Sequence, residues 1–269
     1  MRFLYRCLID IDALRRLGSG VRLFDCRAVL GDPAGGRRAY DAGHIPGALH
    51  ADLDRDLAAA PGSAGRHPLP ERFAMAERFA AWGVDSGDQM VFYDDAGGAF
   101  AARGWWLARW CGHEAAAVLD GGLGAWPGEL TTCLTVPDRG DFRLRPPLTR
   151  TVAVAEIEGR PGEFSLIDAR TKRRFDGLEE PIDPVAGHIP GARCRPFQEN
   201  LDANGRFRPA SELRQRFAGL EDNPVCYCGS GVTAAHNVLA MRLAGFDEPA
   251  LYPGSWSEWI ADPERPISP

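Results

Sequence analysis

The chain repeats itself, and this duplication constrains its fold more than any other feature. The hexapeptide GHIPGA occurs at residues 43–48 and again at residues 187–192. Further segments match between the two halves in the same order, namely LFDCR with LIDAR, MVFY with PVCY, and VLDGG with ALYPG. Glycine and proline mark turns in any fold, so one shared turn would carry little weight. Four matched pairs in one order indicate two copies of a single domain.

Each copy alternates short apolar runs with helical patterns. The apolar runs indicate buried strands at 21–24, 90–93, 116–119, 165–167, 224–227 and 250–252. The helical patterns cover 71–82, 101–111, 211–217 and 232–244. This alternation predicts an α/β fold with two tandem domains, each a mostly parallel sheet flanked by helices on both faces. The predicted parts are a first domain at 1–135, a proline-rich linker at 136–150 and a second domain at 151–269.

Composition narrows the functional classes. A length of 269 residues suits two domains, and a formal charge of −6 argues against a general nucleic-acid binder. No apolar stretch approaches the roughly 20 residues of a membrane helix, and the first residues lack a signal-like apolar region. The seven cysteines are scattered and odd in number, which favours a reducing, cytoplasmic setting. No motif for a metal or another cofactor is found, so none is expected.

The sequence around Cys228 carries the chemistry. This cysteine directly follows the predicted strand 224–227 and begins a loop with glycines at 229 and 231. A helical pattern starts directly after the loop. Ligand sites in parallel sheets lie beyond the carboxyl ends of the strands. The N–H groups at a helix N-terminus stabilise an anion there and favour a thiolate. The pattern therefore predicts Cys228 as a sulfur nucleophile in an anion-binding loop.

The cysteines admit two other interpretations, a structural role for Cys226 and a phosphatase loop around Cys228. Cys226 lies within the apolar strand and is predicted to be a small buried hydrophobic residue. A cysteine phosphatase loop needs an arginine six residues after its cysteine, and Ala234 occupies that position. Without the cation that binds phosphate, phosphatase chemistry is excluded.

Taken together, these residues resemble the rhodanese sulfurtransferases in their two-domain form. The resemblance covers nearly the whole chain, and its carriers are the D-x-R at each domain start, both GHIPGA turns, the CGSGVTA loop and the segments GGLGAW and GSWSEW. The CGSGVTA loop is similar to the 3-mercaptopyruvate branch, because the thiosulfate branch carries basic residues there. The resemblance implies transfer of a sulfane sulfur from 3-mercaptopyruvate through a persulfide on Cys228 to cyanide or a thiol, with release of pyruvate. A thioredoxin-like protein is a candidate thiol acceptor.

Two alternatives stay open at this point. One is a thiosulfate:cyanide sulfurtransferase on the same fold. The other is a persulfide carrier that receives sulfur from a partner protein without turnover. The first domain is expected to be catalytically silent, because Asp94 stands where the second domain has its thiol, and to cover the site instead.

The resemblance also implies a serine–histidine–aspartate set of Ser230, His67 and Asp54. Its purpose would be to deliver a proton to the departing enolate or the donor carbonyl, with Asp54 orienting the imidazole. For His67 the alternative is an exposed loop histidine, and for Ser230 a plain loop residue.

Substrate binding is assigned to the loop backbone and to arginines. The N–H groups of Gly229, Gly231, Val232 and Thr233 would hold the anionic sulfur, although Thr233 reads more simply as a helix cap. Arg174 matches the family's first carboxylate-binding arginine. A second arginine is usual before GHIPG, but the loop 176–186 is acidic and has none. Arg173 could substitute for it or be a solvated surface residue. Otherwise the donor is a different one, or the affinity for 3-mercaptopyruvate is low.

Overall fold

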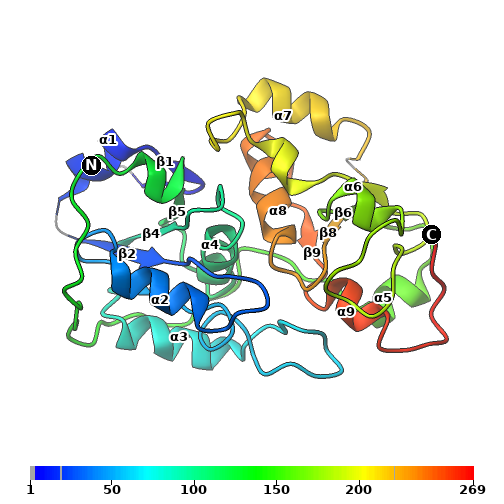
Figure 1. Ribbon diagram of the computed structural model, residues 1–269, viewed down its shortest axis with the longest axis horizontal. Helices are drawn as coiled ribbons and strands as arrows, with labels where there is room; N and C mark the ends of the chain where they lie inside the picture. The colour runs from blue at the N-terminus through cyan, green and yellow to red at the C-terminus, as the bar shows by residue number, and fades with distance from the viewer. Residues whose placement is uncertain (1–3, 19, 221) are drawn as a thin grey trace. The chain divides into compact units, whose positions relative to one another are not determined.

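The computed structural model describes residues 4–18, 20–220 and 222–269. They form two compact units, each with its own parallel sheet (Figure 1). The first unit comprises Met1–Ala59, Pro70–Thr149 and Asn204–Arg206, and the second comprises Ala60–Leu69, Arg150–Ala203 and Phe207–Pro269. The predicted α/β fold with two tandem domains is confirmed.

The sheet of the first unit has the order β1-β5-β4-β2-β3, and all neighbouring strands in it are parallel. Its strands are β1 (Leu8–Ile9), β2 (Val21–Asp25), β3 (Leu49–His50), β4 (Gln89–Tyr93) and β5 (Ala116–Leu119). Its helices are α1 (Ile11–Leu17), α2 (Gly35–Ala42), α3 (Arg72–Ala81), α4 (Ala101–Trp110) and the 3₁₀ turn η1 (Gly122–Ala125).

Both faces of this sheet are covered, which explains why β4 is apolar and buried along its whole length. Side chains alternate along a strand, so Val91 and Tyr93 share one face and pack in a core cluster with residues of α1. On the other face, Phe92 stacks on Phe24 with ring centroids 5.0 Å apart, and Phe24 meets Phe79 of α3 at 6.4 Å.

The second unit repeats the plan with the strand order β7-β6-β8-β9, again all parallel. Its strands are β6 (Ser165–Asp168), β7 (Arg193–Cys194), β8 (Pro224–Tyr227) and β9 (Ala250–Leu251). Its helices are α5 (Val154–Gly159), α6 (Lys172–Phe175), α7 (Ala210–Phe217), α8 (Ala234–Leu243), α9 (Ser255–Trp259) and the 3₁₀ turn η2 (Phe197–Asn200). Val225 and Tyr227 of β8 pack against Trp256 and Trp259 of α9, and α8 packs against β8.

The predicted strands and helices are all present, with ends that differ by at most two residues. The two-residue strands β1, β3 and β7 were not predicted, because so short a segment shows no periodicity. Within the described ranges, no helix combines the length and the apolar character that crossing a membrane requires.

In both units, an ion pair between an aspartate and an arginine lies at the carboxyl end of a central strand. Nη2 of Arg170 lies 2.7 Å from Oδ2 of Asp168 and donates to the carbonyl of Gly187 at 2.7 Å. Arg27 makes the same two contacts in the first unit, with Asp25 at 2.6 Å and with the GHIPGA turn at 2.7 Å. In both units, these bonds tie the end of the strand to the turn.

The units exchange short segments that the sequence did not reveal. Residues 60–69 belong to the second unit, although they precede most of the first, and residues 204–206 belong to the first. The predicted linker 136–150 packs along the first unit, where the N–H groups of Phe142, Arg145 and Leu148 donate to the carbonyls of Val84, Cys111 and Arg109 at 3.0 Å each.

Candidate active site

Cys228 lies directly after β8, in a loop that is bonded to the start of α9. Its N–H donates to Oγ of Ser255 at 3.1 Å, and its carbonyl accepts the N–H of Trp256 at 3.0 Å. The carbonyl of Gly229 accepts the N–H of Ser257 at 2.8 Å. The cysteine is 2% exposed. The loop is therefore fixed at the carboxyl end of the strand, where the sequence predicted it.

The two loop glycines make room for different neighbours. Gly231 has a φ of 76°, and a Cβ there would lie 2.3 Å from the carbonyl oxygen of Pro253. A Cβ on Gly229 would lie 3.0 Å from Nη2 of Arg66 and 3.5 Å from Nη2 of Arg174. Gly231 thus lets the backbone curl, and Gly229 lets two guanidinium groups approach the loop.

The helix after the loop begins at Ala234, two residues later than predicted. Val232 is buried in the loop, and Thr233 occupies the N-cap position. The capping interpretation of Thr233 is wrong, because its side chain makes no capping hydrogen bond. Its backbone is already helical, with φ −72° and ψ −12°, whereas a capping side chain needs an extended residue to reach the first N–H groups.

The corresponding loop of the first unit binds a carboxylate. Asp94 follows β4 as Cys228 follows β8, and its buried carboxylate accepts four backbone N–H groups. Oδ1 accepts from Ala96 and Gly98 at 2.9 and 2.8 Å, and Oδ2 accepts from Phe100 and Ala101 at 2.8 and 2.9 Å. Burial raises the pKa of Asp94, and these four N–H groups oppose that rise. A loop of this kind converges N–H dipoles on an anion.

His67 and Ser230 form a buried pair in the second unit. Nδ1 of His67 lies 2.7 Å from Oγ of Ser230, and each residue is 5% exposed. The interpretation of His67 as an exposed loop histidine is therefore wrong. A hydroxyl and an imidazole at this distance can exchange a proton, two residues beyond the candidate nucleophile.

The segment that carries His67 is held by backbone bonds. Gly62 and Gly65 exchange N–H bonds of 3.1 and 3.0 Å, which makes a tight turn. The N–H of Arg66 donates to Oγ of Ser257 at 3.0 Å and so ties the turn to α9. Gly65 has a φ of 103°, and a Cβ there would lie 2.8 Å from the carbonyl oxygen of Gly254. The turn and its bond to α9 therefore fix the backbone next to His67.

Asp54 belongs to the first unit, where it is exposed and its N–H donates to Oδ1 of Asp52 at 3.0 Å. His67 and Ser230 belong to the second unit. The orienting role of Asp54 stays a prediction.

Arg174 is held in place by the acidic loop before GHIPG. Its Nη2 lies 2.7 Å from Oε1 of Glu180 and 3.0 Å from Oδ2 of Asp183. The Glu180 carboxylate also accepts the N–H groups of Ile182 and Asp183 at 3.1 Å each, which shapes the loop. The acidic residues that departed from the family pattern therefore position the first arginine beside Gly229.

The structure does not bring Arg173 to this loop. Arg173 is exposed, and its Nε bonds Glu179 at 2.8 Å on the surface. The prediction that Arg173 binds substrate is corrected in favour of the surface interpretation. Sequence reasoning also missed Arg66, which forms an ion pair with Asp183. The available signals were a cation next to His67 and an acidic loop at 176–186 without an arginine of its own.

Cys226, two residues before Cys228, is fully buried in β8. Burial raises the pKa of its thiol, with a smaller contribution from Cys228. A protonated, enclosed thiol is unreactive, as the sequence predicted.

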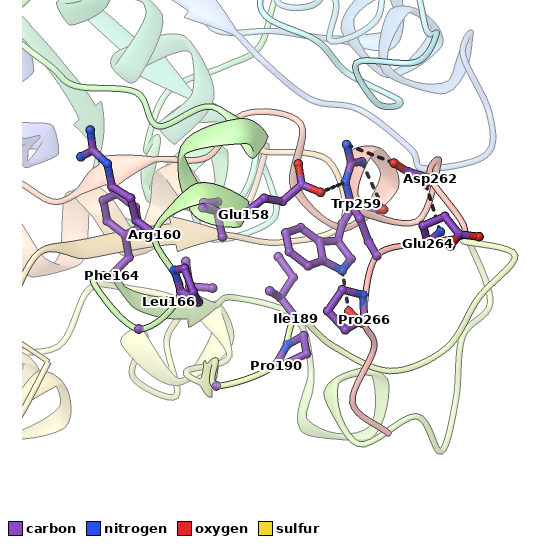
Figure 2. Close-up of a pocket in the computed structure, with 15 residues that line it drawn as sticks. Glu158, Arg160, Phe164, Leu166, Ile189, Pro190, Trp259, Asp262, Glu264 and Pro266 are labelled. Carbon is purple, nitrogen blue, oxygen red and sulfur yellow. Dashed lines mark hydrogen bonds and ion pairs between the residues drawn. The ribbon is translucent and has the colours of Figure 1, made fainter.

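A separate hollow of about 370 Å³ opens elsewhere on the second unit (Figure 2). Its wall is largely apolar, with Phe164, Leu166, Ile189 and Trp259 among the lining residues. Arg265 also lines the hollow, and its Nε donates to Oε1 of Glu158 at 2.9 Å. None of the predicted site residues lines this hollow.

Comparison with known proteins identifies the family. The Rhodanese-like domain family matches residues 11–129 and 153–262. A Pseudomonas aeruginosa protein named "Probable 3-mercaptopyruvate sulfurtransferase" is 50% identical over 260 residues, which cover 91% of each chain. "Thiosulfate/3-mercaptopyruvate sulfurtransferase 1, mitochondrial" from Arabidopsis thaliana is 33% identical over 85% of this chain and 68% of that protein.

The fold agrees with these relatives. The crystal structure of SseA from Escherichia coli, a 3-mercaptopyruvate sulfotransferase, superposes with a TM-score of 0.82 at 28% identity. The match covers 93% of this chain and 98% of SseA. The chain therefore belongs to the rhodanese family, as the resemblance predicted, and it is an enzyme of the sulfurtransferase class.

Proposed function

We propose that the protein moves a sulfane sulfur from 3-mercaptopyruvate, through a persulfide on Cys228, to a thiol or cyanide acceptor and releases pyruvate. The hydrogen bond of 2.7 Å between His67 and Ser230 carries this proposal. Cleavage of 3-mercaptopyruvate leaves an enolate that needs a proton, whereas cleavage of thiosulfate leaves sulfite, which needs none. A buried proton-carrying pair beside the nucleophile therefore favours the first donor.

In the first half-reaction, the Cys228 thiolate attacks the donor's sulfur and a sulfur–sulfur bond forms. The carbon–sulfur bond breaks, and its electron pair goes to the carbon fragment as the enolate of pyruvate. Ser230 and His67 supply the proton that converts the enolate to pyruvate. The donor's own thiol proton stays on the outer sulfur of the persulfide.

In the second half-reaction, a thiolate or cyanide attacks the outer sulfur and Cys228 leaves as a thiolate. The loop N–H groups would stabilise the Cys228 thiolate before its attack and again when it leaves, in the manner that Asp94 illustrates in the first unit. Arg174 would bind the donor's carboxylate, because its guanidinium lies beside Gly229 and is oriented by Glu180.

Steady-state kinetics with the two donors test this proposal. We expect pyruvate release from 3-mercaptopyruvate with cyanide as acceptor, at a higher kcat/KM than thiosulfate turnover. Mass spectrometry should find one added sulfur, about 32 Da, on the peptide that holds Cys228. A strong preference for thiosulfate would overturn the assignment of the donor and favour the thiosulfate:cyanide alternative.

Two cysteine variants provide the matched control. Cys228→Ser should abolish transfer, whereas Cys226→Ser should keep most of it, because Cys226 only fills space in β8. Transfer that persists in Cys228→Ser would contradict the mechanism. A sulfur adduct that leaves Cys228 only in the presence of a protein partner would indicate a carrier.

The acceptor and the compartment are part of the proposal. A thiol such as that of a thioredoxin-like protein would be the cellular acceptor, and neither nucleic acid nor a membrane is a partner. All seven cysteines are free thiols, which supports a reducing compartment, the cytoplasm.

A further inference from the structure

Two guanidinium groups flank Gly229, and they come from different parts of the chain. Arg174 follows β6 within α6, whereas Arg66 lies in the turn that precedes His67. Both approach the same glycine. A Cβ built on Gly229 would lie 3.5 Å from Nη2 of Arg174 and 3.0 Å from Nη2 of Arg66. Asp183 joins them, since it forms ion pairs with both arginines.

The two arginines are engaged to different extents. Within the described ranges, Arg174 uses both Nε and Nη2 to bond Glu180 and Asp183, whereas Arg66 bonds Asp183 through Nη1. Nε of Arg66 is buried and has no hydrogen-bond partner among the described residues. A buried guanidinium N–H without an acceptor is uncommon in a native protein, so this N–H can donate to an acceptor that a ligand brings.

The backbone around Arg66 is fixed, so this N–H is not simply the end of a mobile side chain. The N–H of Arg66 donates to Oγ of Ser257, and Gly65 is pressed against Gly254. The Arg66 side chain is 29% exposed, and Asp183, which orients it, is 2% exposed. The edge formed by Nε and Nη2 is the part of the fork that suits a carboxylate.

We propose that Arg66 binds the carboxylate of the sulfur donor together with Arg174. It would thereby supply the second arginine that the loop 176–186 lacks. The position suits a three-carbon donor, because adjacent Cα atoms are about 3.8 Å apart and Gly229 directly follows the nucleophile. This inference rests on the proposed function, and it names the residue that selects an α-keto acid over a neutral thiol.

Kinetics with Arg66→Gln test the role in recognition. For 3-mercaptopyruvate we expect kcat/KM to fall by about 10- to 100-fold, the size of one lost charge-assisted hydrogen bond. Arg173→Gln is the matched control, because Arg173 is an exposed arginine beside Arg174, and it should change kcat/KM less than about twofold. Arg66→Lys keeps the positive charge but lacks the forked N–H geometry of a guanidinium. Its kcat/KM should therefore lie between those of Arg66→Gln and Arg173→Gln.

A second measurement does not depend on turnover. Cys228 is alkylated with iodoacetate, which carries a carboxylate, and with neutral iodoacetamide, and the two rates are compared by peptide mass spectrometry. We expect Arg66→Gln to lower the iodoacetate-to-iodoacetamide ratio about tenfold or more, with Arg173→Gln near the wild type.

The outcomes separate this inference from the proposed function. If the wild type releases no pyruvate from 3-mercaptopyruvate, the proposed function fails, while the alkylation ratio still decides the role of Arg66. An alkylation ratio in Arg66→Gln equal to that in Arg173→Gln would overturn the inference, even if catalysis is intact.

Discussion

Glu180 shows how an acidic residue serves a site that binds an anion. Its carboxylate bonds Nε and Nη2 of Arg174 and caps its own loop through two backbone N–H groups. Burial alone would raise the pKa of Glu180, but the Arg174 bonds and the N–H groups lower it overall. At the scale of the residue, a negative charge therefore fixes the direction of a positive one.

This pairing predicts a pH effect on stability. A carboxyl group whose pKa is lower in the folded state stabilises fully above its unfolded pKa, and this contribution is lost as the pH falls through the folded value. Glu180→Gln should lower the free energy of unfolding by about 1–2 kcal/mol at pH 7 and by less near pH 3. Urea unfolding at both pH values measures this, and an equal loss at both would contradict it.

The element that matters most is the strand, loop and helix unit that both halves share. After β4 the loop closes around its own carboxylate, Asp94, whereas after β8 it carries the thiol of Cys228. The loop after β4 thus holds a fixed internal anion, and we expect the corresponding loop after β8 to hold an exchangeable sulfur anion. We expect the first domain to be catalytically silent because of this one substitution.

Asp94→Asn tests the loop as an element. An amide keeps one acceptor oxygen and turns an NH₂ group toward two of the four N–H donors, so we expect a loss of about 2–4 kcal/mol in the free energy of unfolding. The exposed neighbour Asp95→Asn is the control, with a change within about 0.5 kcal/mol. Urea unfolding compares them, and equal stabilities would mean that the four bonds contribute nothing.

At the scale of the whole molecule, the exchange of segments joins the two halves of the sequence in one site. Residues 60–69 belong to the second unit and bring His67 to Ser230 and Arg66 to Asp183. The boundary of the catalytic unit is therefore not the boundary of the sequence repeat.

A truncated chain of residues 150–269 tests this. It keeps Cys228 but lacks His67, so pyruvate release should fall by at least about 100-fold, the contribution expected of a general acid. Circular dichroism checks that the fragment is folded. A fusion that restores residues 60–69 through a flexible linker should recover part of the rate. Full activity of the fragment without that segment would show that His67 is dispensable.

The sequence by itself determined the duplicated α/β fold, the end of β8 directly before Cys228 and the place of Asp94 at the corresponding position of the first unit, because these depend on local periodicity and turn chemistry that a short window contains. It also selected Arg174 from its position in the family pattern. Only the tertiary structure decided that His67 bonds Ser230, that Arg173 lies on the surface and that residues 60–69 join the second unit. These facts depend on contacts between residues far apart in the chain, and local sequence patterns do not specify which distant groups meet.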